Sequence, residues 1–295
     1  MEQSSHTLHV YSMLMDERRS AAGDRFVFTG IIVRTNDLPV IRDELRAAAR
    51  AFAGDESEQL KYVPDAMSAQ ASWCAAHGLA AHDAKNEVLK CLVTRPKPEA
   101  TLVVGVVSDP RRGRRRISDG EVYSWGYEIV LQRYVKFLQA RPDRAVGCPN
   151  EVIVDTLTSD AHRFHDTYAT AFEEGWPFMP RAVPSLRSVG ARDMLLTSVA
   201  RYSPALWLPD HVGGAVDDWI KIEQQLDGVA TGLGTAPRPR IQIGARRRVA
   251  QLLPNFRSTL PGYSIVGWPQ DALPNTTLSR WLSNLRTQAR ADAQP

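Results

Sequence analysis

Cysteine is scarce in this sequence of 295 residues, and long hydrophobic runs are absent. Cys74, Cys91 and Cys148 are widely spaced and form no C-x-x-C pair, which argues against a disulfide framework or a zinc ribbon and predicts buried free thiols. No apolar stretch approaches about 18 residues, and the N-terminus lacks the features of a secretory leader. We therefore expect a cytoplasmic protein that is neither exported nor embedded in a membrane.

Several nucleotide-binding and hydrolase motifs are also missing. The sequence has no G-x-S-x-G, no G-x-x-x-x-G-K-[ST] and no G-x-G-x-x-G, so a serine hydrolase, a P-loop protein and a dinucleotide-binding protein are not indicated. The composition is that of a globular protein, 43% hydrophobic and 23% charged, with a net charge of +3. This mildly basic balance permits nucleic-acid binding without requiring it.

The first third of the chain predicts a β-hairpin followed by helices. Residues 8–15 and 25–33 are rich in Val, Ile, Phe and Tyr, and a polar stretch with Gly23 and Asp24 separates them. Apolar residues then recur at helical spacing, which predicts helices over 38–52, 65–76 and 84–93. The last two are expected to form a helical insert.

The middle of the chain alternates strands and helices. Residues 101–107 form an apolar β-branched run typical of a strand buried on both faces, and 151–154 predict a shorter strand. Residues 184–189 predict one more strand. Helices are predicted over 121–140, 160–174 and 204–226. This alternation predicts an α/β fold in which helices flank a sheet.

A change of composition predicts a boundary near residue 235. Residues 228–240 are rich in Gly, Thr, Pro and Arg, which is typical of a linker at the end of a domain over 1–235. Residues 236–295 form a basic, Pro-rich C-terminal extension that ends in an amphipathic helix over 277–289. Trp281 and Leu285 on its apolar face can dock on the protein's own core, on a protein partner or on a second copy of the chain, and the sequence leaves these alternatives open.

Four acidic residues lie near the ends of predicted elements: Asp16, Glu58, Asp155 and Asp210. Carboxylate oxygens suit Mg²⁺ or Mn²⁺, and a pair of such ions can hold the attacking and leaving oxygens in phosphodiester cleavage. Position alone does not single these residues out among the 33 acidic residues of the chain. For each of them, a solvated surface acid is the alternative interpretation.

The order of several short motifs resembles that of the bacterial domain-of-unknown-function family numbered 3800. The resemblance covers about residues 8–226. Its motifs are an acidic pair at the end of the first strand, an apolar second strand, a lysine followed by an aromatic residue, a strand that ends in Asp, and a helix start with Asp. In this sequence they are Met15-Asp16-Glu17, residues 26–33, Gln59-Leu60-Lys61-Tyr62, Val152-Ile153-Val154-Asp155, and Leu206 to Asp210 ahead of Gly213-Gly214.

The resemblance implies a ribonuclease H-like mixed sheet flanked by helices, with a helical insert and the C-terminal extension. It also implies a nuclease that uses Mg²⁺ or Mn²⁺ to hydrolyse RNA or DNA, in a bacterial defence or mobile-element setting. Asp16 and Asp155 would be the central metal ligands, Glu58 and Asp210 would flank them, and Lys61 would face a phosphate. Glu17 should point to the opposite face of the strand.

One departure from the family pattern opens a second interpretation. Gln59 stands where the family has Glu, so either Glu58 takes over or one metal ligand is missing. In the second case the protein would be a catalytically inactive subunit that binds nucleic acid or supports assembly on the same fold.

Two arginine clusters are candidate phosphate-binding surfaces. The first surrounds Gly113 and predicts an exposed basic loop, with a solvated loop as the alternative. Arg246, Arg247 and Arg248 form the second. Tyr123, Trp125 and Tyr127 offer aromatic faces for stacking bases, with burial in the core as the alternative. The arginines of the first cluster are Arg111, Arg112, Arg114, Arg115 and Arg116.

Overall fold

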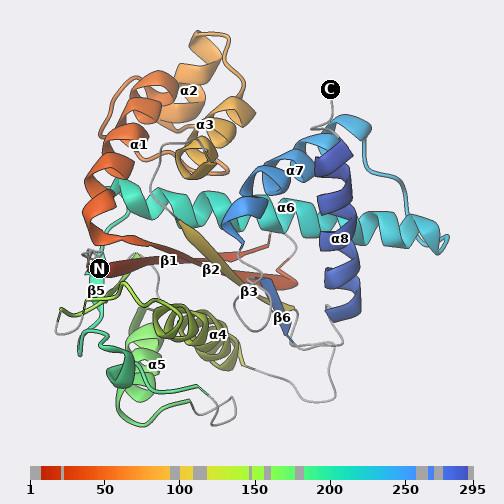
Figure 1. Ribbon diagram of the computed structural model, residues 1–295. Helices are drawn as coiled ribbons and strands as arrows, with labels where there is room; N and C mark the ends of the chain where they lie inside the picture. The colour runs from red at the N-terminus through yellow and green to blue at the C-terminus, as the bar shows by residue number, and fades with distance from the viewer. Residues whose placement is uncertain are drawn as a thin grey trace, which may run out of the picture.

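The protein has an α/β fold in which helices cover both faces of a six-stranded mixed sheet, as Figure 1 shows. The computed structural model describes residues 8–20, 23–93, 100–108, 118–145, 148–155, 161–176, 183–256, 265–268 and 275–291. The α/β class expected from the sequence is thus confirmed. No helix in these ranges is long and apolar enough to cross a membrane. The first arginine cluster, Arg111, Arg112, Arg114, Arg115 and Arg116, lies outside the described residues.

The sheet has the strand order β5-β4-β1-β2-β3-β6. The central three strands are antiparallel, whereas β4 runs parallel to β1, β5 parallel to β4, and β6 parallel to β3. The strands are β1 (Tyr11–Arg19), β2 (Arg25–Arg34), β3 (Thr101–Ser108), β4 (Glu151–Asp155), β5 (Leu196–Ser198) and β6 (Ile265–Trp268).

Alternation along the strands separates two hydrophobic cores. Met13 and Met15 of β1 belong to the core beneath α4 and α5, whereas Leu14 belongs to the core on the other face. Helices α4 (Asp119–Gln139) and α5 (Ala161–Glu173) cover the first face (Figure 1). The second face carries α1 (Leu38–Ala53), α3 (Ala81–Val93), α6 (Trp207–Ala230), α7 (Pro239–Leu252) and α8 (Asn275–Ala291), and α2 (Ala69–Ala76) packs on α1.

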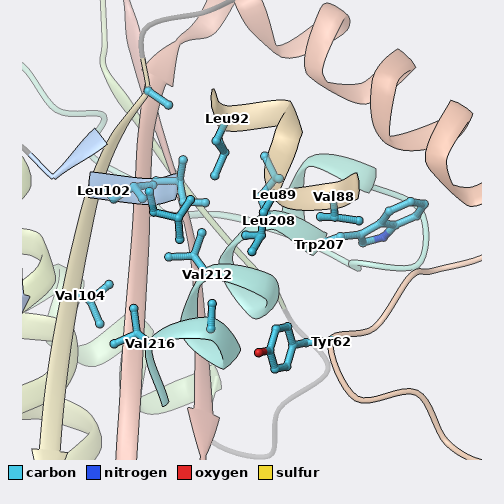
Figure 2. Close-up of a cluster of buried hydrophobic side chains, with 14 of the residues drawn as sticks. Tyr62, Val88, Leu89, Leu92, Leu102, Val104, Trp207, Leu208, Val212 and Val216 are labelled. Atoms are coloured by element: carbon cyan, nitrogen blue, oxygen red, sulfur yellow. The ribbon is translucent and has the colours of Figure 1, made fainter. Parts of the chain in front are cut away.

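Helix α6 supplies much of the second core. Figure 2 shows Leu208, Val212 and Val216 of α6 beside Leu102 and Val104 of β3. These apolar residues recur every four positions, which places them on one side of the helix. The helix follows a short 3-10 turn, η4 (Pro204–Leu206), and this turn also packs against α1.

The first strand is longer than the sequence pattern indicates. We expected it to end at Met15, but β1 continues to Arg19 because its last residues pair with β2, where Arg19 lies opposite Phe26. Asp16 and Glu17 are therefore inside a strand and point to opposite faces of the sheet.

The prediction of a strand over 184–189 is wrong. This segment contains the 3-10 helix η3 (Arg187–Val189), which ends at Gly190 with a φ of +69°. Val183, Leu186 and Val189 recur every three residues and are buried in the core beneath α4 and α5, as suits a 3-10 turn better than a strand. The edge strand is β5, which begins at Leu196.

The C-terminal extension shares the second core. Helix α7, the 3-10 helix η5 (Leu253–Asn255) and strand β6 lie in a region for which the sequence predicted no element, and β6 extends the sheet beside β3. Trp281 of α8 is buried edge-on against Trp219 of α6, with ring centroids 6.1 Å apart. Of the alternatives left open by the sequence, the structure has the last helix docked on the protein's own core.

The three cysteines are free. Cys74 and Cys91 are buried, as expected for thiols that pack like small apolar side chains. The expectation of burial is wrong for Cys148, which is exposed in the connection that precedes β4.

Candidate functional site

Asp16 and Asp155 lie on one face of neighbouring parallel strands. The β1–β4 register pairs Met15 with Val154, so the next position brings the two aspartates side by side. Their face is the one covered by α6, because Leu14 and Ile153, two residues earlier in each strand, pack in the second core. Both aspartates are half-buried. The sheet thus joins two carboxylates that are 139 positions apart in the sequence.

Asp210 reaches the same place from α6. One of its carboxylate oxygens lies 3.2 Å from a guanidinium nitrogen of Arg18, and the other accepts the backbone N–H of Tyr62 at 2.9 Å. Arg18 shares the face of Asp16 because it is two residues further along β1. Asp210 sits in the first turn of α6, where a negative charge interacts favourably with the helix dipole. We call Asp16, Asp155 and Asp210 the carboxylate cluster.

Mutual repulsion marks this cluster. Burial raises the pKa of Asp16 well above its ordinary value, and the negative charges of Glu17, Asp210 and Asp155 raise it further. A hydrogen bond from the Glu17 N–H to Asp16 at 2.9 Å opposes the shift only in part. Carboxylates held this close in a partly dry environment favour either a proton or a bound cation.

Glu17 occupies the opposite face, as the strand alternation predicts. Its carboxylate accepts the hydroxyl of Tyr127 at 2.8 Å, and Tyr127 belongs to α4. Burial and the charge of Glu17 raise the pKa of Tyr127 far above the ordinary tyrosine value. Tyr127 is fully buried, and Tyr123 packs edge-on against Phe28 at 5.8 Å. Tyr127 is therefore part of the core, and the partly buried Tyr123 packs against that core.

Glu58 and Lys61 belong to a loop that lies beside the carboxylate cluster, but their side chains are not bonded to it. Glu58 is half-buried and its backbone N–H bonds to the carbonyl of Asp55 at 3.2 Å. The Lys61 side chain is exposed, while its backbone is held by the side-chain amide of Gln70. Within the described residues, no hydrogen bond or ion pair joins either side chain to the carboxylate cluster. The loop is nevertheless fixed beside the cluster through the Tyr62–Asp210 bond.

The fit to a divalent cation rests on Asp16 and Asp155. Both oxygens of Asp210 are already engaged by Arg18 and Tyr62. Over the described part of the chain, no three His, Cys, Asp or Glu side chains are placed to hold one ion together. Paired aspartates are hard oxygen ligands of the kind that Mg²⁺ and Mn²⁺ take along with water. Such an ion would also relieve the repulsion that raises the pKa of Asp16.

Sequence reasoning missed Thr29, which lies where α6 approaches the sheet closely. Thr29 lies directly opposite Asp16 on β2, is 1% exposed, and its hydroxyl has no hydrogen-bond partner among the described residues. A Cβ added at Gly213 would lie 2.8 Å from that hydroxyl, and one added at Gly214 would overlap the Tyr62 ring. The adjacent glycines were the available signal, because they permit α6 to lie directly on β2 and Tyr62.

The grouping of three cations around Tyr62 was missed as well, although Arg248 belongs to the second arginine cluster singled out in the sequence. Arg18, Lys85 and Arg248 come from β1, α3 and α7, and each lies over the Tyr62 ring. No local pattern relates these residues, because they are far apart in the sequence.

Comparison of the sequence with models of protein families and with curated proteins finds no match.

Proposed function

We propose that this protein is a divalent-metal-dependent nuclease that hydrolyses phosphodiester bonds of RNA or DNA on a ribonuclease H-like scaffold. The observation that carries the proposal is the pair Asp16 and Asp155, side by side on the parallel strands β1 and β4 and electrostatically strained. The mixed sheet with helices on both faces agrees with the scaffold that the sequence resemblance implies. The same resemblance suggests a bacterial defence or mobile-element setting.

The side chains of this chain have distinct tasks in the proposal. Asp16 and Asp155 hold Mg²⁺ or Mn²⁺, and Asp210 keeps Arg18 and the Tyr62 loop beside them. When bound, the metal supplies an activated water and stabilises charge on the scissile phosphate. Because the pKa of Asp16 is raised, a metal that binds below that pKa has to displace a proton, so affinity for the metal increases as pH rises toward it. The proposal assigns no step to Glu58 or Lys61.

The test is cleavage of labelled single- and double-stranded RNA and DNA with Mg²⁺ or Mn²⁺. We expect D16N and D155N each to lose cleavage while remaining folded, because each removes a metal ligand. D166N is the matched control, since Asp166 is an exposed aspartate on α5, on the other face of the sheet. Undiminished cleavage by the D16N/D155N double variant would exclude the proposed metal site.

A non-catalytic nucleic-acid-binding or assembly subunit is the second candidate. Two observations favour it: Gln59 replaces a glutamate of the family pattern, and the guanidinium of Arg18 neutralises Asp210 where a metal ligand would be needed. This function predicts salt-dependent binding of nucleic acid without cleavage. It also predicts that Mn²⁺ leaves the melting temperature unchanged, whereas the nuclease is stabilised by a metal that binds only the folded state.

A further inference from the structure

The feature that carries a further inference is the group of cations around Tyr62, which we call the Tyr62 cation group: Arg18, Lys85 and Arg248. The Lys85 ammonium is 3.9 Å from the centre of the ring, and the guanidinium carbons of Arg18 and Arg248 are 5.2 Å and 5.9 Å from it. Tyr62 itself is fully buried, so the ring is a platform for the cations. Figure 2 shows Tyr62 against α6, on the side of the helix away from Val216.

Tyr62 connects this group to the carboxylate cluster. Its backbone N–H donates to Asp210, and its hydroxyl donates to Asp218, about two turns further along α6. Arg248 forms an ion pair with Asp218 at 3.1 Å, and Arg18 pairs with Asp210. Arg18 is therefore anchored at the carboxylate cluster itself, and Tyr62 connects Lys85 and Arg248 to it.

Charge within the group is unbalanced. Each arginine has one aspartate partner, whereas Lys85 has no ion pair within 4.0 Å among the described residues. The Nε atoms of Arg18 and Arg248 are buried and also have no hydrogen-bond partner in the described part of the chain. Burial lowers the pKa of Lys85, as expected for an ammonium group that is partly removed from water. Unused N–H donors and a surplus positive charge suit an anion.

A purely structural role explains this arrangement less well. One cation over a tyrosine ring is stabilising, but three cations around one ring also repel each other. The charges of Arg248 and Arg18 lower the pKa of Lys85, whereas those of Asp218 and Asp210 raise it. Such a concentration of positive charge would attract a phosphate that the neighbouring carboxylates would otherwise repel.

We propose that Lys85, with Arg18 and Arg248, contacts the phosphodiester backbone of nucleic acid bound at the carboxylate cluster. This inference rests on the proposed function, because it takes nucleic acid as the substrate. An ammonium is a compact point charge that binds phosphate oxygens without strict geometry, and Lys85 is the member of the group whose charge is not paired within the described residues. Lys85 of the helical insert then has the phosphate-facing role that the resemblance implies for Lys61.

The experiment measures binding separately from cleavage. Fluorescence anisotropy of labelled single-stranded RNA, single-stranded DNA and duplex DNA is followed in EDTA over a series of salt concentrations. We expect K85Q and K85M to weaken binding on the order of three- to ten-fold and to reduce the salt slope by about one. K85R should retain most of the affinity. K90Q on the same helix is the control, because Lys90 is exposed and pairs with Glu87.

The outcomes separate this inference from the nuclease proposal. A wild-type protein that binds a probe, with K85Q and K85M keeping its affinity and salt slope, would overturn the inference alone. A lower melting temperature with an unchanged salt slope would assign Lys85 a structural role and would also overturn it. Loss of binding in K85Q together with no metal-dependent cleavage by the wild type would support the inference and overturn the nuclease proposal. Absence of binding by the wild type would overturn both.

Discussion

The guanidinium of Arg18 lies 3.2 Å from the carboxylate of Asp210, and this ion pair joins the strand that carries Asp16 to the helix that covers it. The two side chains are only 23% and 21% exposed, so water screens the pair less than it would on the surface. Asp210 contributes to the raised pKa of Asp16, and Arg18 partly offsets the charge of Asp210. The carboxylate cluster is therefore tied to the cations around Tyr62 by both geometry and charge.

The raised pKa of Asp16 predicts a pH dependence of stability. Between about pH 4, the ordinary carboxyl pKa, and the raised value, the folded protein binds a proton that the unfolded chain has lost, so the free energy of unfolding decreases as pH rises through this range. We expect D16N to abolish this decrease and to be more stable than wild type by roughly 1 kcal/mol at neutral pH without metal. Urea unfolding at several pH values measures both effects, with D166N as the control. A D16N variant with the wild-type pH dependence would show that Asp16 is not strained.

Replacement of glycine by alanine in α6 is predicted to change the free energy of unfolding in opposite directions, depending on the position. G213A and G214A place a methyl group against Thr29 and Tyr62, so we expect each to lower the free energy of unfolding by about 1–3 kcal/mol. A Cβ at Gly228, on the same helix, meets nothing within 4 Å. G228A should therefore raise the free energy of unfolding by about 0.5–1 kcal/mol through helix propensity. Denaturant unfolding of the three variants is the measurement, and equal effects would contradict the close approach of α6.

A buried ion pair predicts a large loss of stability. The guanidinium of Arg25 in β2 lies 2.6 Å from the carboxylate of Asp217 in α6, and the two side chains are 5% and 11% exposed. Replacing Arg25 by Met leaves Asp217 charged and without this partner, which should cost about 3–5 kcal/mol. K90Q, which breaks an exposed pair on α3, should change stability by at most about 0.5 kcal/mol. Thermal or urea unfolding compares the two, and similar melting of R25M and wild type would refute the prediction.

Docking of the last helix predicts that the C-terminal extension stabilises the whole fold. The Trp281 ring packs on Trp219, and its indole N–H donates to Asp227 at 3.1 Å. We expect W281A to lower the free energy of unfolding by about 3–5 kcal/mol, because it opens a cavity in the second core. N284A, on the exposed side of the same helix, is the matched control. Unchanged melting of W281A, or of a chain shortened to residues 1–240, would show that the last helix contributes nothing to this core.

Local patterns in the sequence predicted most elements but not their ends or the short edge strands. Residues 101–107 form a strand because β-branched side chains suit a pleated surface buried on both faces. The strand over 184–189 failed because a period of three in a short segment resembles neither a helix nor an alternating strand. β6 has only four residues within a Pro-rich region, and its pairing with β3 requires contacts far away in the sequence.

For the candidate site, the sequence by itself determined the residue types and the position of Asp155 at the end of a strand, whereas it placed Asp16 past a strand that in fact continues to Arg19. Only the tertiary structure decided that these aspartates are neighbours, that Asp210 is shared between Arg18 and Tyr62, and that Lys85 lies over the Tyr62 ring. The physical reason is the range of the interactions. Propensity and periodicity act over a few residues, whereas strand register and the crossing of α6 over β1 and β2 bring together groups nearly 200 positions apart.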